Sequence, residues 1–264
     1  MLTFSKSRTD CNRRVEGDLG PMQGTLFDST GRVVLVTGGS KGIGRAIARA
    51  LALEGADVAI ASRTLADLER SAHEIENDTG SRVTPLVLDV TQRDQVDRVT
   101  AEAAERLGGL HILVNSGSYP GGSATATGPI ETVNEDDLIG DFDVKYAGAL
   151  RCARAAIPFM KEQGWGRIIN ISGGNARNAG NLSGGARNVS LVHLTKTLAV
   201  QLGRFGITVN CIHPGITRTE RTPGLLEARA RQLGVTPEEV EAKDFAPDAD
   251  SGNSICRMVD ASEV

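Results

Sequence analysis

Residues 33–44 read VVLVTGGSKGIG and lead directly into RAIARALALEG at 45–55, and this stretch decides the fold. The first five residues form a β-branched apolar run of strand length, and residues 45–55 have the spacing of an amphipathic helix. Glycine at 38, 42 and 44 permits a tight turn, close approach of the backbone to a pyrophosphate and close helix packing. The N-terminus of the helix offers free N–H groups to an anion. A tight turn without a ligand is the alternative, but the strand–turn–helix context favours a dinucleotide site.

Apolar runs and amphipathic segments alternate along the rest of the chain. Such alternation is typical of βαβ units, and continuous apolar runs indicate strands buried on both faces. We therefore predict an α/β fold, a Rossmann-type doubly wound parallel sheet with six readable strands. A charged segment beyond Pro214 suits one or two solvent-facing helices. The predicted strands are 33–37, 57–62, 83–90, 111–116, 167–172 and 207–212.

The length of 264 residues, with 40% hydrophobic content, suits one large α/β domain. We predict a single dinucleotide-binding domain over residues 22–264, in which 216–250 form the substrate-loop region. Residues 1–21 are polar and charged, and we expect a disordered arm there.

Charge and cysteine content limit the partners. The formal net charge is −4, so we predict neither nucleic acid nor a membrane as a partner. The four cysteines have neither disulfide density nor metal-ligand spacing, which indicates reduced thiols and no metal. The N-terminal residues lack the apolar run of a signal peptide. We predict a cytoplasmic protein with a small-molecule substrate.

Several motifs, all in order, resemble the short-chain dehydrogenase/reductase family between about Gly31 and Val264. They are TGGSKGIG at 37–44, LDV at 88–90, NSG at 115–117, GRIINIS at 166–172 and GITVNCIHPG at 206–215. The resemblance implies a nicotinamide dinucleotide, carbonyl or alcohol chemistry and a homo-oligomer, a dimer or tetramer. Together with the glycine turn, it gives the predicted cofactor contacts: Thr37, Gly38, Ser40, Lys41, Gly42, Ile43, Gly44, Ser62, Arg63, Asp89, Val90, Asn115, Gly117, Pro214, Gly215, Thr217 and Thr219.

The second strand ends in Ser62-Arg63, where a carboxylate would bind the ribose hydroxyls of NAD. Arg63 and Lys41 suit a 2′-phosphate through charge-assisted hydrogen bonds. We therefore predict NADP(H) in preference to NAD(H), with two ordinary surface cations as the alternative.

The family's catalytic Tyr-x-x-x-Lys pair is missing. The chain has two tyrosines, Tyr119 and Tyr146, and neither has a lysine four residues later. Counting back from HLTKTLA at 193–199 puts the family's tyrosine at Gly184 and its lysine at Asn188.

Two further positions depart from the family. Its serine falls on Gly173, one place after Ser172, and Lys145 stands where the family places an asparagine. Lysine and asparagine thus exchange positions, and Lys145 is a candidate to serve the ribose that Asn188 no longer serves. A surface cation is the alternative for Lys145.

Two classes of function follow. The first is an oxidoreductase with a rearranged site, in which Ser172, Lys145, Asn188 or Tyr119 orient the substrate and water supplies the proton. For Tyr119 an ordinary loop tyrosine is the alternative. The second class is a non-redox enzyme, a dehydratase or lyase, or a cofactor-binding protein without turnover. A polar loop suits a polar or anionic substrate, or simply solvent; it contains Asn175, Arg177, Asn178, Asn181, Ser183 and Arg187.

Residues 258–264 resemble the start of the family's final helix, which normally leads to a seventh strand. We expect that this helix and strand are missing and that the chain is a truncated form. The strand at 207–212 would then present an exposed edge, which favours association or aggregation.

Overall fold

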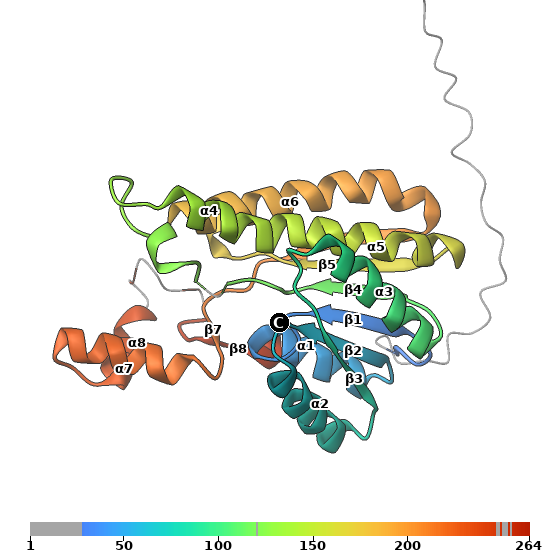
Figure 1. Ribbon diagram of the computed structural model, residues 1–264. Coiled ribbons are helices and arrows are strands. Elements are labelled where there is room, and N and C mark those ends of the chain that lie inside the picture. Colours follow the sequence, from blue (N-terminus) through green and yellow to red (C-terminus); the bar gives the residue numbers. More distant parts are fainter. Residues whose placement is uncertain (1–27, 120, 247–248, 250–252, 254) are drawn as a thin grey trace, which may run out of the picture.

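The computed structural model describes residues 28–119, 121–246, 249, 253 and 255–264 (Figure 1). The predicted N-terminal arm lies outside these residues, so its disorder and the domain boundary stay predictions.

Six parallel strands form the main sheet, in the order β3-β2-β1-β4-β5-β6. This confirms the predicted doubly wound sheet. The strand order reverses between β1 and β4, and in such sheets ligands bind in the crevice beyond the carboxyl ends of the strands at that point. The strands are β1 (Val33–Thr37), β2 (Asp57–Ser62), β3 (Val83–Val87), β4 (Ile112–Asn115), β5 (Gly166–Ile171) and β6 (Ile207–Ile212).

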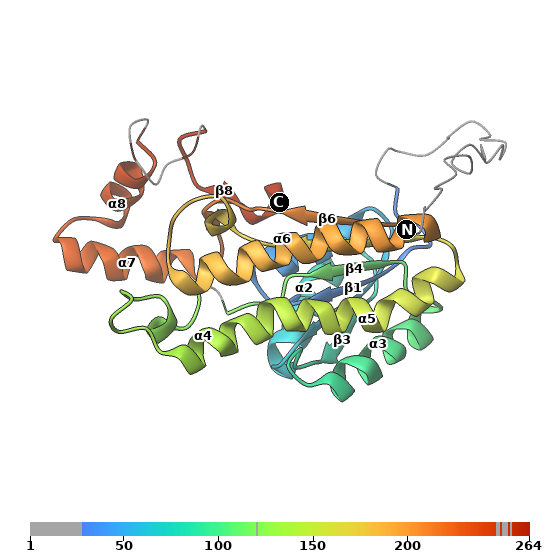
Figure 2. The ribbon, with the colours of Figure 1, turned by 90° about the horizontal axis from the view of Figure 1, so that it is seen from above.

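Helices cover both faces of the sheet (Figures 1 and 2). Helices α1 and α2 pack on one face, and α3, α5 and α6 pack on the other. No helix in the described part of the chain is long and apolar enough to cross a membrane. The helices are α1 (Gly42–Leu53), α2 (Leu65–Thr79), α3 (Arg93–Leu107), α4 (Glu135–Phe142), α5 (Gly148–Glu162), α6 (Leu182–Leu202), α7 (Thr222–Leu233) and α8 (Pro237–Asp244).

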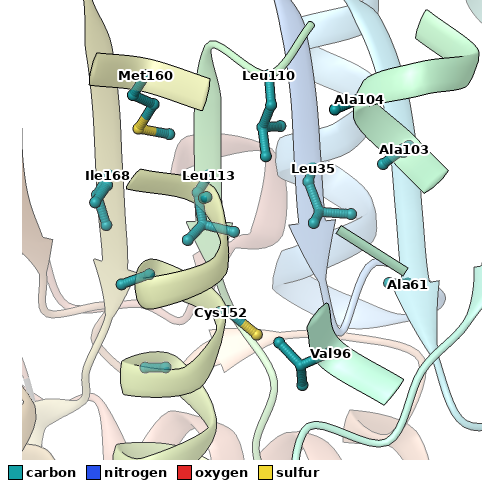
Figure 3. Close-up of a cluster of buried hydrophobic side chains, with 14 of the residues drawn as sticks. Leu35, Ala61, Val96, Ala103, Ala104, Leu110, Leu113, Cys152, Met160 and Ile168 are labelled. Carbon is teal, nitrogen blue, oxygen red and sulfur yellow. The ribbon is translucent and has the colours of Figure 1, made fainter. Parts of the chain in front are cut away.

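The larger of the two cores lies under α3 and α5 (Figure 3). Leu35 and Leu113 point from neighbouring strands toward Val96 of α3 and Cys152 of α5, and all four are buried. These apolar contacts fix the carboxyl ends of β1 and β4, where the candidate site lies.

Helix α6 begins at Leu182, nine residues before the apolar periodicity of its sequence becomes clear at Leu191. The intervening LSGGARN has little apolar periodicity, so its sequence gives no helical signal. The structure shows a local cause for the earlier start, because the Asn181 side chain accepts a hydrogen bond from the backbone N–H of Gly184 at 2.6 Å.

A single π-helical turn, η2 (Asp143–Ala147), joins α4 to α5 and carries Lys145. Such turns insert an extra residue into a helix and occur frequently at functional sites. The turn places the Lys145 side chain in the protein interior.

Strand β6 is an edge of the main sheet, and no seventh strand pairs with it among the described residues. Its side chains alternate, with Ile207 and Val209 buried and Thr208 and Asn210 exposed. The expectation of strands buried on both faces is therefore wrong for β6, because one of its faces has no helix over it in the described structure.

The last residues form a short strand and a turn instead of extending the main sheet. Strand β8 (Val259–Asp260) pairs in parallel with β7 (Thr217–Arg218). A one-turn 3-10 helix, η5 (Ala261–Glu263), follows, and Asp260 and Glu263 cap its start reciprocally. This short sheet holds the end of the chain against the segment that follows β6.

Candidate functional site

A cavity of about 880 Å³ opens beyond the carboxyl ends of the central strands. It is lined by all the predicted catalytic residues and by all the predicted cofactor contacts except Thr37 and Asn115. The position and size suit a dinucleotide together with a small substrate.

Thr37 and Asn115 lie behind the cavity wall and hold it together. The hydroxyl oxygen of Thr37 accepts hydrogen bonds from the backbone N–H groups of Ser116 and Gly117, at 3.2 and 3.3 Å. The Asn115 side chain donates to the Asn170 side chain at 2.9 Å. Both residues therefore fix the ends of β1, β4 and β5 relative to one another.

The glycine turn is shaped by two close approaches of the backbone. Gly38 has a φ of +69°, and a Cβ there would lie 2.9 Å from the backbone of Ser116. A Cβ on Gly44 would lie 2.2 Å from the carbonyl oxygen of Gly38. Any other residue at these two positions would open the turn, so they keep the backbone N–H groups of the α1 N-terminus close to the cavity.

A carboxylate of the chain itself lies at the N-terminus of α1. The backbone N–H of Gly42 donates to both side-chain oxygens of Glu220, at 2.9 and 3.1 Å. Arg45 of the same helix lies 3.9 Å from this carboxylate. The turn therefore binds an anionic group, the carboxylate of Glu220. Because a pyrophosphate is also an anion, the residues of the turn fit the cofactor that the fold implies.

Both predicted ligands of a 2′-phosphate already have partners. Lys41 forms an ion pair with Asp67 at 2.6 Å. Arg63 donates to the Tyr119 hydroxyl at 3.1 Å, and its guanidinium lies 5.1 Å from the centre of that ring. The hydroxyl of Tyr119 therefore lies beside Arg63 at the end of β2, and the structure shows no hydrogen bond from it to the other predicted catalytic residues.

Lys145, Ser172 and Asn188 are brought together on the cavity wall. The ammonium of Lys145, whose residue is only 9% exposed, donates to the backbone carbonyl of Ser172 at 3.1 Å. The Ser172 hydroxyl donates to the backbone carbonyl of Asn188 at 3.1 Å. Burial, followed by repulsion from Arg187, lowers the pKa of Lys145 to about 7, although the nearby Cys211 acts in the opposite direction.

Asparagine side chains lie against Gly173 and Gly184, the positions at which the resemblance puts the family's serine and tyrosine. A Cβ on Gly173 would lie 2.7 Å from the side-chain nitrogen of Asn188, and a Cβ on Gly184 would lie 2.5 Å from that of Asn175. These contacts explain why glycine suits both positions. Hydroxyl-bearing side chains at 173 and 184 would require the two asparagines to move.

Behind the cavity wall, Arg187 forms a buried pair with Asp141 that no sequence motif predicts. Arg187 is 5% exposed and Asp141 is fully buried, with 4.0 Å between their charged atoms. Burial alone would raise the pKa of Asp141, but hydrogen bonds from Ser183 and Ser123 outweigh it and hold the pKa below its usual value. The one feature of the sequence that points to this pair is Arg187 itself, which comes directly before Asn188, the position that the resemblance assigns to the family's lysine.

The fold and the cleft together define a Rossmann-type α/β protein with a nucleotide-sized crevice at the switch point of its sheet. The sequence model of the short chain dehydrogenase family matches residues 32–230. The chain therefore belongs to this family.

Several known proteins are similar to the chain over most of its length. It is 35% identical over 205 residues to the short-chain reductase protein NovJ of Streptomyces niveus, covering 74% of this chain and 72% of that one. L-Sorbose reductase of Gluconobacter frateurii, solved with NADPH and L-sorbose, aligns with a TM-score of 0.79 and 28% identity over 89% and 86% of the two chains. NAD⁺-bound xylitol dehydrogenase aligns with a TM-score of 0.77 and 26% identity, over 89% of each chain.

Proposed function

We propose that this protein is an NADP(H)-dependent oxidoreductase that interconverts a carbonyl compound and an alcohol, with Lys145 as the proton-transfer group. The observation that carries the proposal is the buried Lys145 ammonium on the cleft wall, with a pKa of about 7. A group whose pKa lies near the working pH serves well as both proton donor and acceptor. The family's tyrosine position is Gly184, so another group must take that role.

The reaction needs a hydride at carbon and a proton at oxygen. When it is bound, NADPH would supply the hydride and would itself be oxidised to NADP⁺. The Lys145 ammonium gives its proton to the developing alkoxide, and the resulting neutral amine regains a proton from water. The backbone carbonyl of Ser172 holds the ammonium in place, and Asn188 has a buried side-chain oxygen without a hydrogen-bond partner among the described residues. That oxygen is a buried acceptor whose hydrogen bond is unmade.

The proposed preference for NADP(H) rests on Arg63 and Lys41, which both line the cavity near the end of β2. Arg63 would exchange the neutral Tyr119 hydroxyl for the 2′-phosphate, which forms stronger charge-assisted hydrogen bonds, and Lys41 would exchange the Asp67 carboxylate for it. The similar proteins include one solved with NADPH and one with NAD⁺, so the preference depends on these two side chains.

A second candidate is a protein that binds the cofactor without redox turnover. One observation favours it: the Ser172 hydroxyl already donates to the Asn188 carbonyl, so its proton is not available to a substrate oxygen. In that case the cleft would serve a non-redox reaction, such as a dehydration, or would sense the cofactor.

The test follows NADPH consumption at the nicotinamide absorbance with a broad carbonyl panel, and NADPH binding separately by calorimetry. Lys145→Met is compared with wild type and with Lys196→Met, which removes an exposed lysine of α6. We expect Lys145→Met to lower turnover by about 10² to 10⁴, the usual contribution of a positioned acid, while cofactor affinity changes little.

Wild-type turnover in Lys145→Met would show that Lys145 is not the proton donor. Binding of NADPH without consumption for any carbonyl would favour the second candidate. Lys196→Met should behave as wild type in both assays.

A further inference from the structure

One wall of the cleft carries two basic side chains close together. Lys145 and Arg187 both line the cavity and are both nearly buried. Their mutual repulsion contributes to the lowered pKa of Lys145. Asp141 is the carboxylate nearest to Arg187, at 4.0 Å, and is shared with two serines. Arg187 therefore shares Asp141 with Ser123 and Ser183, and no ion pair to Lys145 is present among the described residues.

The carboxylates that line the cavity elsewhere are engaged with other groups. Asp67 binds Lys41, Asp89 accepts from Thr91, Glu220 accepts from Gly42, and Asp244 binds Arg229. None of these bonds involves Lys145 or Arg187. Lys145 thus has no ion-pair partner among the described residues of the cleft, whereas Arg187 is paired with Asp141.

The guanidinium of Arg187 has a hydrogen-bond donor that is not used by the described residues. One terminal nitrogen donates to the Tyr119 carbonyl at 3.0 Å and lies 3.4 Å from the Ser118 hydroxyl. The Nε–H is buried and has no hydrogen-bond partner among the described residues. A buried donor without a partner is unfavourable, and arginine presents its donors in a fork that matches the two oxygens of a carboxylate.

We propose that Arg187 and Lys145 form an anion subsite and that the substrate is an oxo acid, reduced to a hydroxy acid whose carboxylate binds Arg187. The inference rests on the proposed function and adds the substrate class to it. The substrate carboxylate would give Lys145 and Arg187 a shared anionic partner, and it would place the substrate carbonyl near the Lys145 ammonium. The competing explanation is that Arg187 only fastens residues 118 and 119 to α6.

The experiment compares oxo acids with their methyl esters, which keep the carbonyl and remove the charge. Pyruvate, 4-oxopentanoate and 5-oxohexanoate, each with its ester, are titrated by calorimetry into the protein saturated with NADP⁺, so that no turnover occurs. At least one acid should bind about tenfold or more tighter than its ester, the ratio given by a charge-assisted hydrogen bond. Equal binding of every acid and ester, or no binding of any acid, overturns the proposal.

Variants locate the subsite. Arg187→Met should bring the acid-to-ester ratio close to one, and Arg187→Lys should keep part of it. Arg177→Met, which removes an exposed arginine from the neighbouring loop, should leave the ratio unchanged. If Arg187→Met lowers the melting temperature but keeps the ratio, the arginine is only a clamp. If Arg187→Met does not fold, the ratio of acid to ester affinities of the wild-type protein still tests the proposal.

The two proposals fail in different ways. Tight binding of an acid without any consumption of NADPH would support the proposed anion subsite and contradict the proposed oxidoreductase activity. Reduction of acids and esters with equal efficiency would keep the oxidoreductase and remove the subsite.

Discussion

Lys145 links the chemistry of the cleft to the stability of the fold. Its pKa falls from 10.5 to about 7 on folding, because burial disfavours the charged form and Arg187 repels it. Between these values the unfolded chain binds a proton that the folded chain does not, so stability rises with pH across this window. The difference between the two pKa values corresponds to on the order of 5 kcal/mol in the free energy of unfolding. This stability is lost progressively as the pH falls from about 10.5 to about 7.

Replacement of Lys145 by methionine should therefore change the pH dependence of unfolding. We expect the melting temperature of Lys145→Met, relative to wild type, to be highest near pH 6 and to fall steadily toward pH 10. The loss of the bond to Ser172 adds a constant offset, so the slope with pH is the relevant quantity. Lys196→Met serves as the control and should follow wild type. A difference that does not vary with pH would contradict the lowered pKa.

The charge of Asp67 is expected to affect the affinity for NADPH through its ion pair with Lys41. Its carboxylate binds Lys41 and would face the negative charge of a 2′-phosphate. Arg63→Ala should lower NADPH affinity by about tenfold or more and leave NADH affinity nearly unchanged, because it removes a charge-assisted hydrogen bond. Asp67→Asn should act in the opposite direction, with a gain for NADPH alone.

Calorimetric titration with both cofactors measures these changes. Asp97→Asn removes a carboxylate from an exposed ion pair on α3 and is the matched control. Wild-type affinities for NADPH and NADH that are equal would exclude the proposed preference.

Local elements around the glycine turn were predictable because their constraints are local. Strand β1, the turn and helix α1 follow from a contiguous run of residues whose apolar period and glycines each point to one conformation. The onset of α6 was not predictable from periodicity, because Asn181 caps a segment without an apolar stripe.

The side-chain arrangement of the site was only partly predictable. The positions of Lys145 and Asn188 followed from the resemblance, but the burial of Lys145 depends on a π-helical turn that no spacing in the sequence reveals. Asp141 lies 42 residues from Ser183, its hydrogen-bond partner, and such long-range contacts leave no local pattern. The sequence motifs thus predicted the location of the cleft, but only the structure shows which charged side chains are buried beside it.

Helix α1 provides an element-level test through Glu220. Glu220→Gln removes a negative charge from the place that a pyrophosphate would occupy, so NADPH and NADH should both bind about two- to tenfold tighter, in line with the strength of anion interactions at a helix N-terminus. Glu74→Gln is the control, since Glu74 binds Arg45 of α1 but not the backbone of Gly42. A gain for one cofactor only, or equal gains in both variants, would contradict this interpretation.

For the whole molecule, β6 is the element most exposed to association. It lies at the edge of the main sheet, and an edge strand with free backbone groups can pair with another chain. We expect wild-type protein to self-associate as its concentration rises, and Thr208→Lys to reduce this association, because a charge on an edge strand opposes pairing.

Analytical ultracentrifugation over a concentration series provides the measurement. Gln232→Lys places the same charge on the exposed face of α7 and should not change association. Unchanged association in Thr208→Lys would point to another surface, and a wild-type monomer at all concentrations would remove the prediction.

The hydrogen bond between Gly42 and Glu220 joins parts of the chain that are 178 residues apart, and Glu220 comes just before α7. A cofactor pyrophosphate must displace this carboxylate, which frees the segment next to the substrate region. Binding of the two ligands would then be coupled, and the coupling would be reciprocal, so that each changes the affinity for the other by the same factor. We expect a compulsory order of addition, cofactor first, with NADP⁺ inhibiting competitively against NADPH but not against the carbonyl substrate.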